Sequence, residues 1–238
     1  MLNSSEIKQA LLGLLLSDGY LGSSNRFVIT SKHKEFRDHC RTLFDSFPNS
    51  DKKLYVKDYY DKRFGVYTYI LAANYGAYFS KFREWCYPSK EKELTKQVVD
   101  KIDARCLAYM WAGDGFLEHA KNRSKDKIQN VGWYCLESFN KDQLQYFCNV
   151  MNEKYTLNFR LSPVVWGKRF RPKISGVGLQ NFISLIYPFV TDTFQYKTKL
   201  FYKKSLYCNY NLPSAEHIFV TYDNIQEYED IVESYKKL

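Results

Sequence analysis

The sequence lacks the cysteine and histidine spacings of a zinc site or a disulfide framework. Its six cysteines include no Cys-x-x-Cys pair, and its four histidines add no zinc-binding spacing. A P-loop lysine motif and a paired His-Asn-His site are also absent, which argues against nucleotide hydrolysis and one nuclease class. We interpret the cysteines as reduced thiols and expect an intracellular, reducing compartment, whether organelle, bacterial cytoplasm or phage-infected cytoplasm.

Long apolar runs are absent as well. The N-terminal residues lack the basic region and the apolar stretch of a signal peptide. The longest apolar stretch, Ala10–Leu16, is interrupted by Gly13 and is far too short to cross a bilayer. We therefore expect a soluble chain without a membrane partner.

The chain does contain enough apolar material for a core, and it has an excess of basic charge. Hydrophobic residues make up 45% of its 238 residues, and the formal net charge is +9. Residues 1–96 carry 16 Lys and Arg against 11 acidic residues, residues 97–204 carry 17 against 9, and residues 205–238 carry 2 against 6. Because the positive charge lies in the folded body, a polyanionic partner is favoured, nucleic acid first, over a simply basic protein.

An internal duplication organises the chain. Leu11–Leu21 and Leu107–Leu117 are each an apolar helical run that ends in Asp-Gly, followed by an aromatic residue and Leu. The aspartates of these motifs, Asp18 and Asp114, lie 96 residues apart, which is about the length of a small domain. We infer two similar repeats.

The order of expected elements repeats after each motif. Strand-like patterns occur at Arg26–Lys32, Leu54–Tyr60, Phe64–Ala72, Lys127–Leu136, Asn158–Trp166 and Arg169–Ser175. Helical patterns occur at Glu35–Phe47 and at Lys141–Tyr155 behind the capping candidate Asn140, and before the Tyr-Pro pairs at 87–88 and 187–188. Each repeat therefore has the order helix, strands, helix, strands, helix.

These patterns divide the chain into three parts. The first repeat with its linker spans residues 1–93, and the charged, turn-like Ser89–Glu93 is the linker candidate. The second repeat spans residues 94–204. Residues 205–238 match neither repeat and form a C-terminal appendage with a predicted helix at Ile225–Lys236.

The motif helices are apolar on all sides, so each must be buried on nearly every side. Gly13 in the first helix, and Ala108, Ala112 and Gly113 in the second, are small enough to let two backbones approach. Packing these helices together brings two carboxylates to helix C-termini, where the helix dipole disfavours negative charge. Their repulsion predicts a divalent cation with oxygen ligands, although each Asp-Gly could instead be a simple turn.

These motifs resemble those of the LAGLIDADG homing endonucleases, in the single-chain form with two motifs. The similarity covers residues 5–204 and includes Leu107-Ala-Tyr109 before the second Asp-Gly, the segment 138–158, and Tyr196-Lys197 after Pro188-Phe189. It implies an α+β fold of two pseudo-symmetric αββαββα repeats, with a DNA-binding β-saddle and both motif helices packed at the centre. Leu16-Ser17 and Tyr109 depart from the family pattern, which affects the expected packing more than the chemistry.

The resemblance also implies an active site. Asp18 and Asp114 would hold Mg²⁺, for which Mn²⁺ could substitute, beside the scissile phosphates. Lys92 and Lys197 would be the basic catalytic residues, with Lys90 as the alternative to Lys92. The implied function is metal-dependent hydrolysis of both strands of a long, non-palindromic double-stranded DNA target by an intron-encoded monomer. The alternatives are a maturase that binds its own intron RNA and a DNA-binding protein that does not cleave; the presence of both aspartates favours cleavage.

Alternating strand positions supply the candidate DNA-binding residues, because successive side chains point to opposite faces of a sheet. Arg169, Arg171 and Lys173 share one face of their strand, and Pro172 on the opposite face suggests an edge position. Arginine and lysine on such a ribbon can recognise guanine in the major groove, while a solvated polar face is the alternative for any one residue. The candidates are Arg26, Thr30, Lys32, Lys57, Arg160, Lys168, Arg169, Arg171 and Lys173.

Overall fold

The computed structural model describes residues 3–46, 53–63, 65–122, 127–164, 167–203 and 215–236. The expected element ends Phe47, Phe64 and Trp166, and the residue Cys208, lie outside these ranges. Within them, no helix is long and apolar enough to span a membrane. The five cysteines that the structure describes are free thiols.

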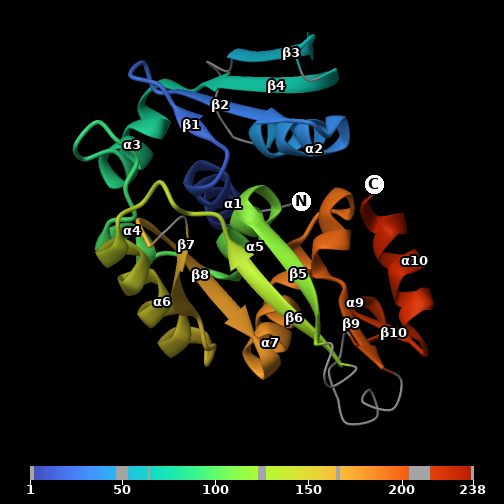
Figure 1. Cartoon of the computed structure of the whole chain (residues 1–238). Helices are drawn as coiled ribbons and strands as arrows, with labels where there is room; N and C mark the ends of the chain where they lie inside the picture. Colours follow the sequence, from blue (N-terminus) through green and yellow to red (C-terminus); the bar gives the residue numbers. More distant parts are fainter. Residues whose placement is uncertain are drawn as a thin grey trace.

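Two repeats of the same αββαββα order form the body of the molecule (Figure 1). The first consists of α1 (Ser4–Leu16), β1 (Tyr20–Leu21), β2 (Arg26–Ser31), α2 (Lys34–Asp45), β3 (Lys53–Asp61), β4 (Val66–Asn74) and α3 (Ser80–Cys86), with the short 3-10 helix η1 (Gly76–Phe79) before α3. The second consists of α5 (Ala104–Asp114), β5 (Gly115–Asn122), β6 (Lys127–Tyr134), α6 (Lys141–Tyr155), β7 (Arg160–Val164), β8 (Arg169–Ser175) and α7 (Gly176–Ile186). Helix α4 (Lys96–Val99) lies between them.

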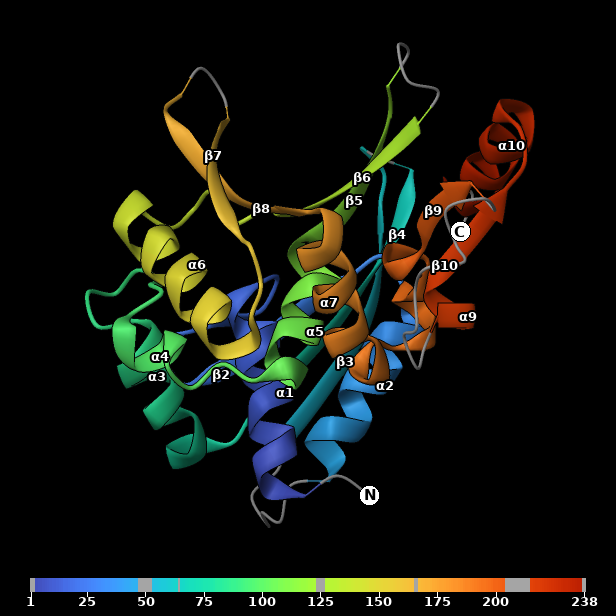
Figure 2. The same ribbon diagram turned by 90° about the horizontal axis from the view of Figure 1, so that it is seen from below.

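The two antiparallel sheets have the same topology. Their strand orders are β1-β2-β4-β3 and β5-β6-β8-β7, so each repeat places its strands in equivalent positions. Figure 2 shows hairpins β5–β6 and β7–β8 projecting away from helices α6 and α7, which cover the other side of the second sheet. The expected fold of two pseudo-symmetric repeats is confirmed.

Helices α1 and α5 pack against each other between the two sheets (Figure 1). Both begin at side-chain caps: Asn3 Oδ1 accepts from the Ser5 and Glu6 amides at 3.0 Å, and Asp103 Oδ1 accepts from the Cys106 amide at 2.8 Å. The predicted all-round burial is confirmed, because every residue from Ala10 to Leu16 is buried.

Gly13 permits this close packing. A Cβ atom at Gly13 would meet the backbone carbonyl of Cys106 and would lie 2.7 Å from the Cβ of Tyr109. The small residue predicted to let the helices approach therefore lies at their crossing. Tyr109, which departs from the family pattern, is accommodated because its hydroxyl reaches out of the crossing to His39 Nε2 at 2.6 Å.

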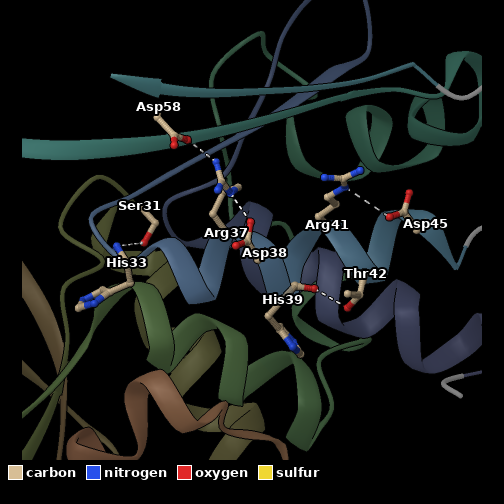
Figure 3. A network of polar contacts seen from close by, with 9 residues as sticks. All are labelled: Ser31, His33, Arg37, Asp38, His39, Arg41, Thr42, Asp45 and Asp58. Atoms are coloured by element: carbon tan, nitrogen blue, oxygen red, sulfur yellow. Dashed lines mark hydrogen bonds and ion pairs between the residues drawn. The ribbon is translucent and has the colours of Figure 1, made fainter. Parts of the chain in front are cut away.

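The first sheet has one face buried on helices and one face exposed. On β2, Phe27 and Ile29 are buried, whereas Arg26 and Thr30 are exposed, as the alternation predicted. Helix α2 is fixed to strand β3 by the buried Arg37, whose guanidinium contacts the carboxylates of Asp38 and Asp58 at 2.6 Å each (Figure 3). Because Asp38 lies on α2 itself, the contact with Asp58 is the one that ties α2 to the sheet.

The predicted edge position of Pro172 is wrong, because β8 lies between β6 and β7. The register explains why proline is tolerated there. Pairing of β8 with β6 covers only Lys173–Ser175, so Pro172 lies just beyond the ladder and pairs only with Leu161 of β7. No hydrogen bond to β6 is therefore lost at the missing N–H.

Several short elements were not predicted. Strand β5 begins directly after the second motif, where Glu118, His119 and Lys121 obscure any apolar alternation. Beyond α7 the chain forms η2 (Tyr187–Phe189), η3 (Asp192–Thr198), β9 (Leu200–Lys203), α9 (Ala215–Ile218), β10 (Phe219–Tyr222) and α10 (Ile225–Lys236). The predicted helices at Lys141–Tyr155, capped by Asn140, and at Ile225–Lys236 are confirmed.

The C-terminal segment packs against the second sheet. Strand β10 pairs in parallel with β9, so the segment is tied to residues before position 204. Asn130 of β6 donates to the Phe201 carbonyl at 2.9 Å and accepts from its amide at 3.0 Å, and the Tyr228 hydroxyl of α10 donates to the His119 carbonyl at 3.2 Å. The first two bonds join β9 to β6, and the third holds α10 beside β5 (Figure 2).

Candidate active site

The two motif aspartates meet where α1 and α5 end. Asp114 is the last residue of α5, and Asp18 follows the Ser17 cap of α1. A Cβ atom at Gly113 would lie 2.8 Å from Ser17 Cβ and 3.1 Å from Asp18 Oδ2, so the two helix ends are in contact. Only glycine at position 113 lets the ends approach this closely, and the structure brings together the two predicted carboxylates.

Both carboxylates are in surroundings that disfavour their charge. Burial and, secondarily, the negative charge of Asp18 raise the pKa of Asp114 to about 7. Asp18 reaches the surface, yet the protein atoms packed around it raise its pKa too. A pair of carboxylates with raised pKa values at a helix junction is the electrostatic condition that a bound cation relieves.

A lysine lies against the end of each motif helix. Lys92 Nζ, from the linker, donates to the carbonyls of Ser17 at 2.7 Å and Gly19 at 2.9 Å. Lys197 Nζ, from η3, donates to the carbonyls of Ala112 at 2.7 Å and Gly113 at 3.3 Å. These carbonyls lie at the negative ends of the helix dipoles, which favour a cation there.

The structure distinguishes Lys92 from Lys90. Lys90 is exposed, and its backbone is left-handed with φ of +75°. Lys92 is partly buried, and desolvation lowers its pKa, as it also lowers the pKa of Lys197. An ammonium has three N–H groups, so each lysine keeps one donor beyond its two carbonyl contacts. That donor is available to a water or a phosphate oxygen.

The charges of the two lysines act unequally on the pKa values of the two aspartates. Among the charged groups that counter the raised pKa of Asp18, Lys197 acts more strongly than Lys92. For Asp114 the order is reversed, and Lys92 acts more strongly than Lys197. By charge, each aspartate is therefore affected more strongly by the lysine of the other repeat.

The donor set fits a hard divalent cation. Asp18 and Asp114 offer carboxylate oxygens, the ligands that Mg²⁺ prefers. Among the described residues no cluster of three or more His, Cys, Asp and Glu side chains could hold a metal. Mg²⁺ keeps several waters and binds through one or two carboxylates, which agrees with this sparse protein contribution.

Three residues at the site were not predicted. The Trp111 indole donates to the Lys197 carbonyl at 3.0 Å, and the Cys135 amide donates to the Asp114 carbonyl at 2.8 Å. Glu137 acts on Asp114 through its charge and forms an ion pair with Arg171. Trp111 lies inside the motif and could have been singled out there, whereas Cys135 and Glu137 have no sequence signal that links them to Asp114.

The candidate DNA-binding residues of the first repeat occupy one face of their sheet. The pairing registers place Arg26 and Thr30 of β2 on the same face as Lys57 of β3. Lys32 is exposed just after β2. Sequence reasoning missed the exposed tyrosines of this face: Tyr20, Tyr55 and Tyr59 are 58%, 49% and 47% exposed.

The second repeat shows the same arrangement with a different composition. Arg160, Arg169, Arg171 and Lys173 share one face of strands β7 and β8, and Lys168 is exposed in the turn between them. Trp133 and Phe116 belong to this face as well, with Lys173 Nζ 5.0 Å from the Trp133 ring and the Arg171 guanidinium 5.8 Å from the Phe116 ring. The predicted shared face of Arg169, Arg171 and Lys173 is therefore confirmed, while the contacts of these residues with DNA stay a prediction.

Two fused repeats with one shared, metal-compatible carboxylate centre are typical of a nuclease that acts on duplex DNA. Residues 8–181 match the LAGLIDADG DNA endonuclease family, and the chain belongs to that family. The match covers most of both repeats and includes both motif aspartates. The expected family is confirmed.

The chain is similar to several solved structures, of which the first named here shares its fold. The homing endonuclease I-WcaI bound to its DNA recognition sequence has a TM-score of 0.66 at 21% identity, over 82% of this chain and 86% of that chain. I-DmoI in complex with DNA and Mn has a TM-score of 0.43 at 14% identity, over 80% and 99%. Full-length DUF199/WhiA from Thermatoga maritima has a TM-score of 0.49 at 9% identity, over 100% and 68%. No curated protein matches the chain.

Proposed function

We propose that the protein is a site-specific homing endonuclease that makes a metal-dependent double-strand break in a long, non-palindromic DNA target. The observation that carries this proposal is the shared centre, in which Asp18 and Asp114 meet at the ends of α1 and α5 with Lys92 and Lys197 beside them. Such a centre serves hydrolysis of phosphodiester bonds, because it combines ligands for a cation with fixed positive charges.

Each residue of the centre has a proposed role. Asp18 and Asp114 would hold Mg²⁺ or Mn²⁺, which when bound lowers the pKa of water and neutralises charge on the leaving oxygen. Lys92 and Lys197 would use their remaining N–H to orient a water or to offset phosphate charge. Because desolvation lowers the pKa of both lysines, a role in proton transfer is also within their chemistry.

The two sheet faces support an asymmetric duplex target. The registers place Tyr20, Tyr55 and Tyr59 with Arg26, Lys53 and Lys57 on the first face, and Arg160, Arg169 and Arg171 with Lys173 and Trp133 on the second. Two unlike surfaces on one chain match two unlike half-sites, so the target would be non-palindromic and the active form a monomer spanning about two helical turns.

The alternatives are an intron RNA maturase and a DNA-binding protein that does not cleave. Neither activity requires two carboxylates with raised pKa values near two partly buried lysines. Burying charged groups costs free energy, so their presence favours a catalytic centre over a binding scaffold. Binding of its own intron RNA is compatible with the same protein and would be an additional activity.

The test is incubation with the intron-free insertion locus of the protein's own gene and Mg²⁺. The proposal expects a double-strand break at one position, no break in chelator, and no break with Asp18→Asn or Asp114→Asn. Binding of the duplex should persist in both variants, because asparagine is nearly isosteric. Cleavage by both variants at saturating Mg²⁺ would show that the centre lies elsewhere.

A further inference from the structure

The 3-10 helix η3 carries Lys197 together with a buried aromatic residue, Phe194. In a 3-10 helix, residues three apart lie on the same side. Lys197 Nζ accordingly lies 5.0 Å from the centre of the Phe194 ring, and Phe194 is only 5% exposed. The lysine therefore rests on the ring as well as on the α5 carbonyls.

The Phe194 ring packs between residues of the other repeat. It makes edge contacts with the rings of His33, at 5.1 Å between centroids, and Phe36, at 4.7 Å. Both belong to the start of α2 in the first repeat. Figure 3 shows that His33 and His39 point away from strands β3 and β4, on the side of α2 opposite to Arg37 and Arg41.

Helix α2 thus holds parts of the second repeat at two points. His33 and Phe36 hold η3, and His39 Nε2 lies 2.6 Å from the Tyr109 hydroxyl of α5. Arg37 fixes α2 to β3, so the contacts that His33, Phe36 and His39 make with the second repeat come from a helix anchored to the first sheet. The backbone of Lys197 is held from its own repeat, by the Trp111 indole at 3.0 Å.

Lys92 is supported differently. The Gln143 side chain of the second repeat donates a hydrogen bond of 3.3 Å to Glu93, the neighbour of Lys92. That contact is polar and partly exposed, so it constrains Lys92 less than a buried ring cluster constrains Lys197. The two lysines have equivalent places at the helix ends but unequal support from the opposite repeat.

We infer that Phe194, seated between His33 and Phe36, is a positioning residue for Lys197, so that the first repeat controls cleavage of one DNA strand. The inference rests on the proposed function. A pseudo-two-fold axis relates the lysines just as a dyad relates the two scissile phosphates, so each lysine serves one strand. Loss of the ring contact then affects the strand that Lys197 serves and largely spares the strand that Lys92 serves.

The experiment compares cleavage of the two strands on duplexes labelled separately, and nicking against linearisation of a supercoiled plasmid carrying one target. Phe194→Leu keeps an apolar side chain but removes the ring. It should slow one strand by about 10- to 100-fold, the range expected for misplacing a catalytic group, and should accumulate nicked plasmid. Phe36→Leu should slow the same strand from the other repeat, and metal-free DNA affinity should be unchanged in both variants.

Two control variants separate positioning from general destabilisation. Phe147→Leu removes a buried ring of α6 that packs on Tyr134 and Phe159, and it should lower stability without bias between strands. Gln143→Ala removes the contact with Glu93 and should leave the Lys197 strand unaffected. Should Phe194→Leu fail to fold, Phe194→Met, whose unbranched side chain adapts to irregular space, takes its place.

The outcomes are distinguishable. Equal slowing of both strands by Phe194→Leu, or an unchanged strand ratio in Phe36→Leu, would overturn the positioning role while leaving the endonuclease intact. Failure of the unaltered protein to cut either strand would instead overturn the proposed function.

Discussion

The two repeats are alike at their centre and unlike on their sheet faces. At the centre, each gives one aspartate at a motif helix end and one lysine on its carbonyls. On the faces, the first repeat presents exposed tyrosines, with the Arg26 guanidinium 5.7 Å from the Tyr55 ring. The second presents arginines and Lys173, and one of these, Arg171, is held by Glu137.

This difference follows from what each region must do. A cation between two carboxylates permits little variation in geometry, because ligand type and distance are fixed by the ion. Side chains on a sheet face have no such constraint, since the backbone positions them whatever their chemistry. Fusion of two repeats thus leaves one chain free to vary its faces independently while its centre stays symmetric.

The largest expected effect is loss of cleavage on removing either central carboxylate. Asp18→Asn and Asp114→Asn should each lower the cleavage rate by about 10³-fold or more, since the cation supplies several kcal/mol of charge stabilisation. Single-turnover assays on both strands would measure this. If one variant cut one strand normally, the centre would be two separate sites and not one shared site.

The lysines should show the next largest effect. Lys92→Met should slow cleavage by about 10²-fold, the usual cost of losing one fixed donor at a reacting group. Lys90→Met is the matched control and should cut normally, because Lys90 is exposed. A loss confined to Lys90→Met would mean that the linker rearranges on DNA.

The helix crossing can be tested with two glycines. Gly13→Ala should destabilise the protein by about 1–3 kcal/mol, because its Cβ would meet the Cys106 backbone. Gly113→Ala should destabilise it less, since it meets the Ser17 side chain, but should lower cleavage more by displacing Asp18. Thermal unfolding and cleavage should be measured for both variants. If the crossing lay elsewhere, Gly113→Ala would destabilise the protein more than Gly13→Ala and would lower cleavage less.

The unlike faces should differ in their salt dependence. Arg169→Ala, if Arg169 contacts a phosphate, should make the slope of log affinity against log salt shallower by about 0.9. Tyr55→Phe in the first repeat should leave that slope unchanged, because no charge is removed. Equal slopes for all three proteins would show that Arg169 neutralises no phosphate, and would remove one distinction between the faces.

The smallest expected effect is a pH dependence of stability without metal. Because the pKa of Asp114 in the folded protein is about 7, against 3.8 ordinarily, the folded state keeps a proton that the unfolded chain loses. Stability should therefore fall as pH rises from about 4 to 7. Burial lowers the pKa of His33, His39 and His119, which gives the opposite slope near pH 6.

Comparison with Asp114→Asn separates the effect of the Asp114 carboxylate on the pH dependence of stability from the effect of these histidines. The variant should be more stable than the unaltered protein above pH 7 in chelator, with the difference vanishing near pH 4. Thermal melts across this range would measure it. A constant difference at every pH would mean that Asp114 has the same pKa in the folded and unfolded states.

Much of the fold could be predicted because its signals are local. The strand at Arg169–Ser175 and the helix at Lys141–Tyr155 have the bounds that periodicity and capping predicted. Strand β5 was missed, and the edge position predicted for the strand of Pro172 was wrong, because strand order depends on pairing with distant residues. The same division holds at the site, where the carboxylates were predicted and Glu137 and Phe194 were not.

The sequence by itself determined the duplication, the buried motif helices and the two central aspartates, since an all-round apolar helix ending in Asp-Gly is a local pattern. Only the tertiary structure decided that Lys92 and not Lys90 lies at the helix end. It also decided that Phe36 of the first repeat packs on the Phe194 ring that lies against Lys197 of the second. These choices depend on contacts between residues far apart in the chain. Packing sets such contacts, and no spacing along the sequence encodes them.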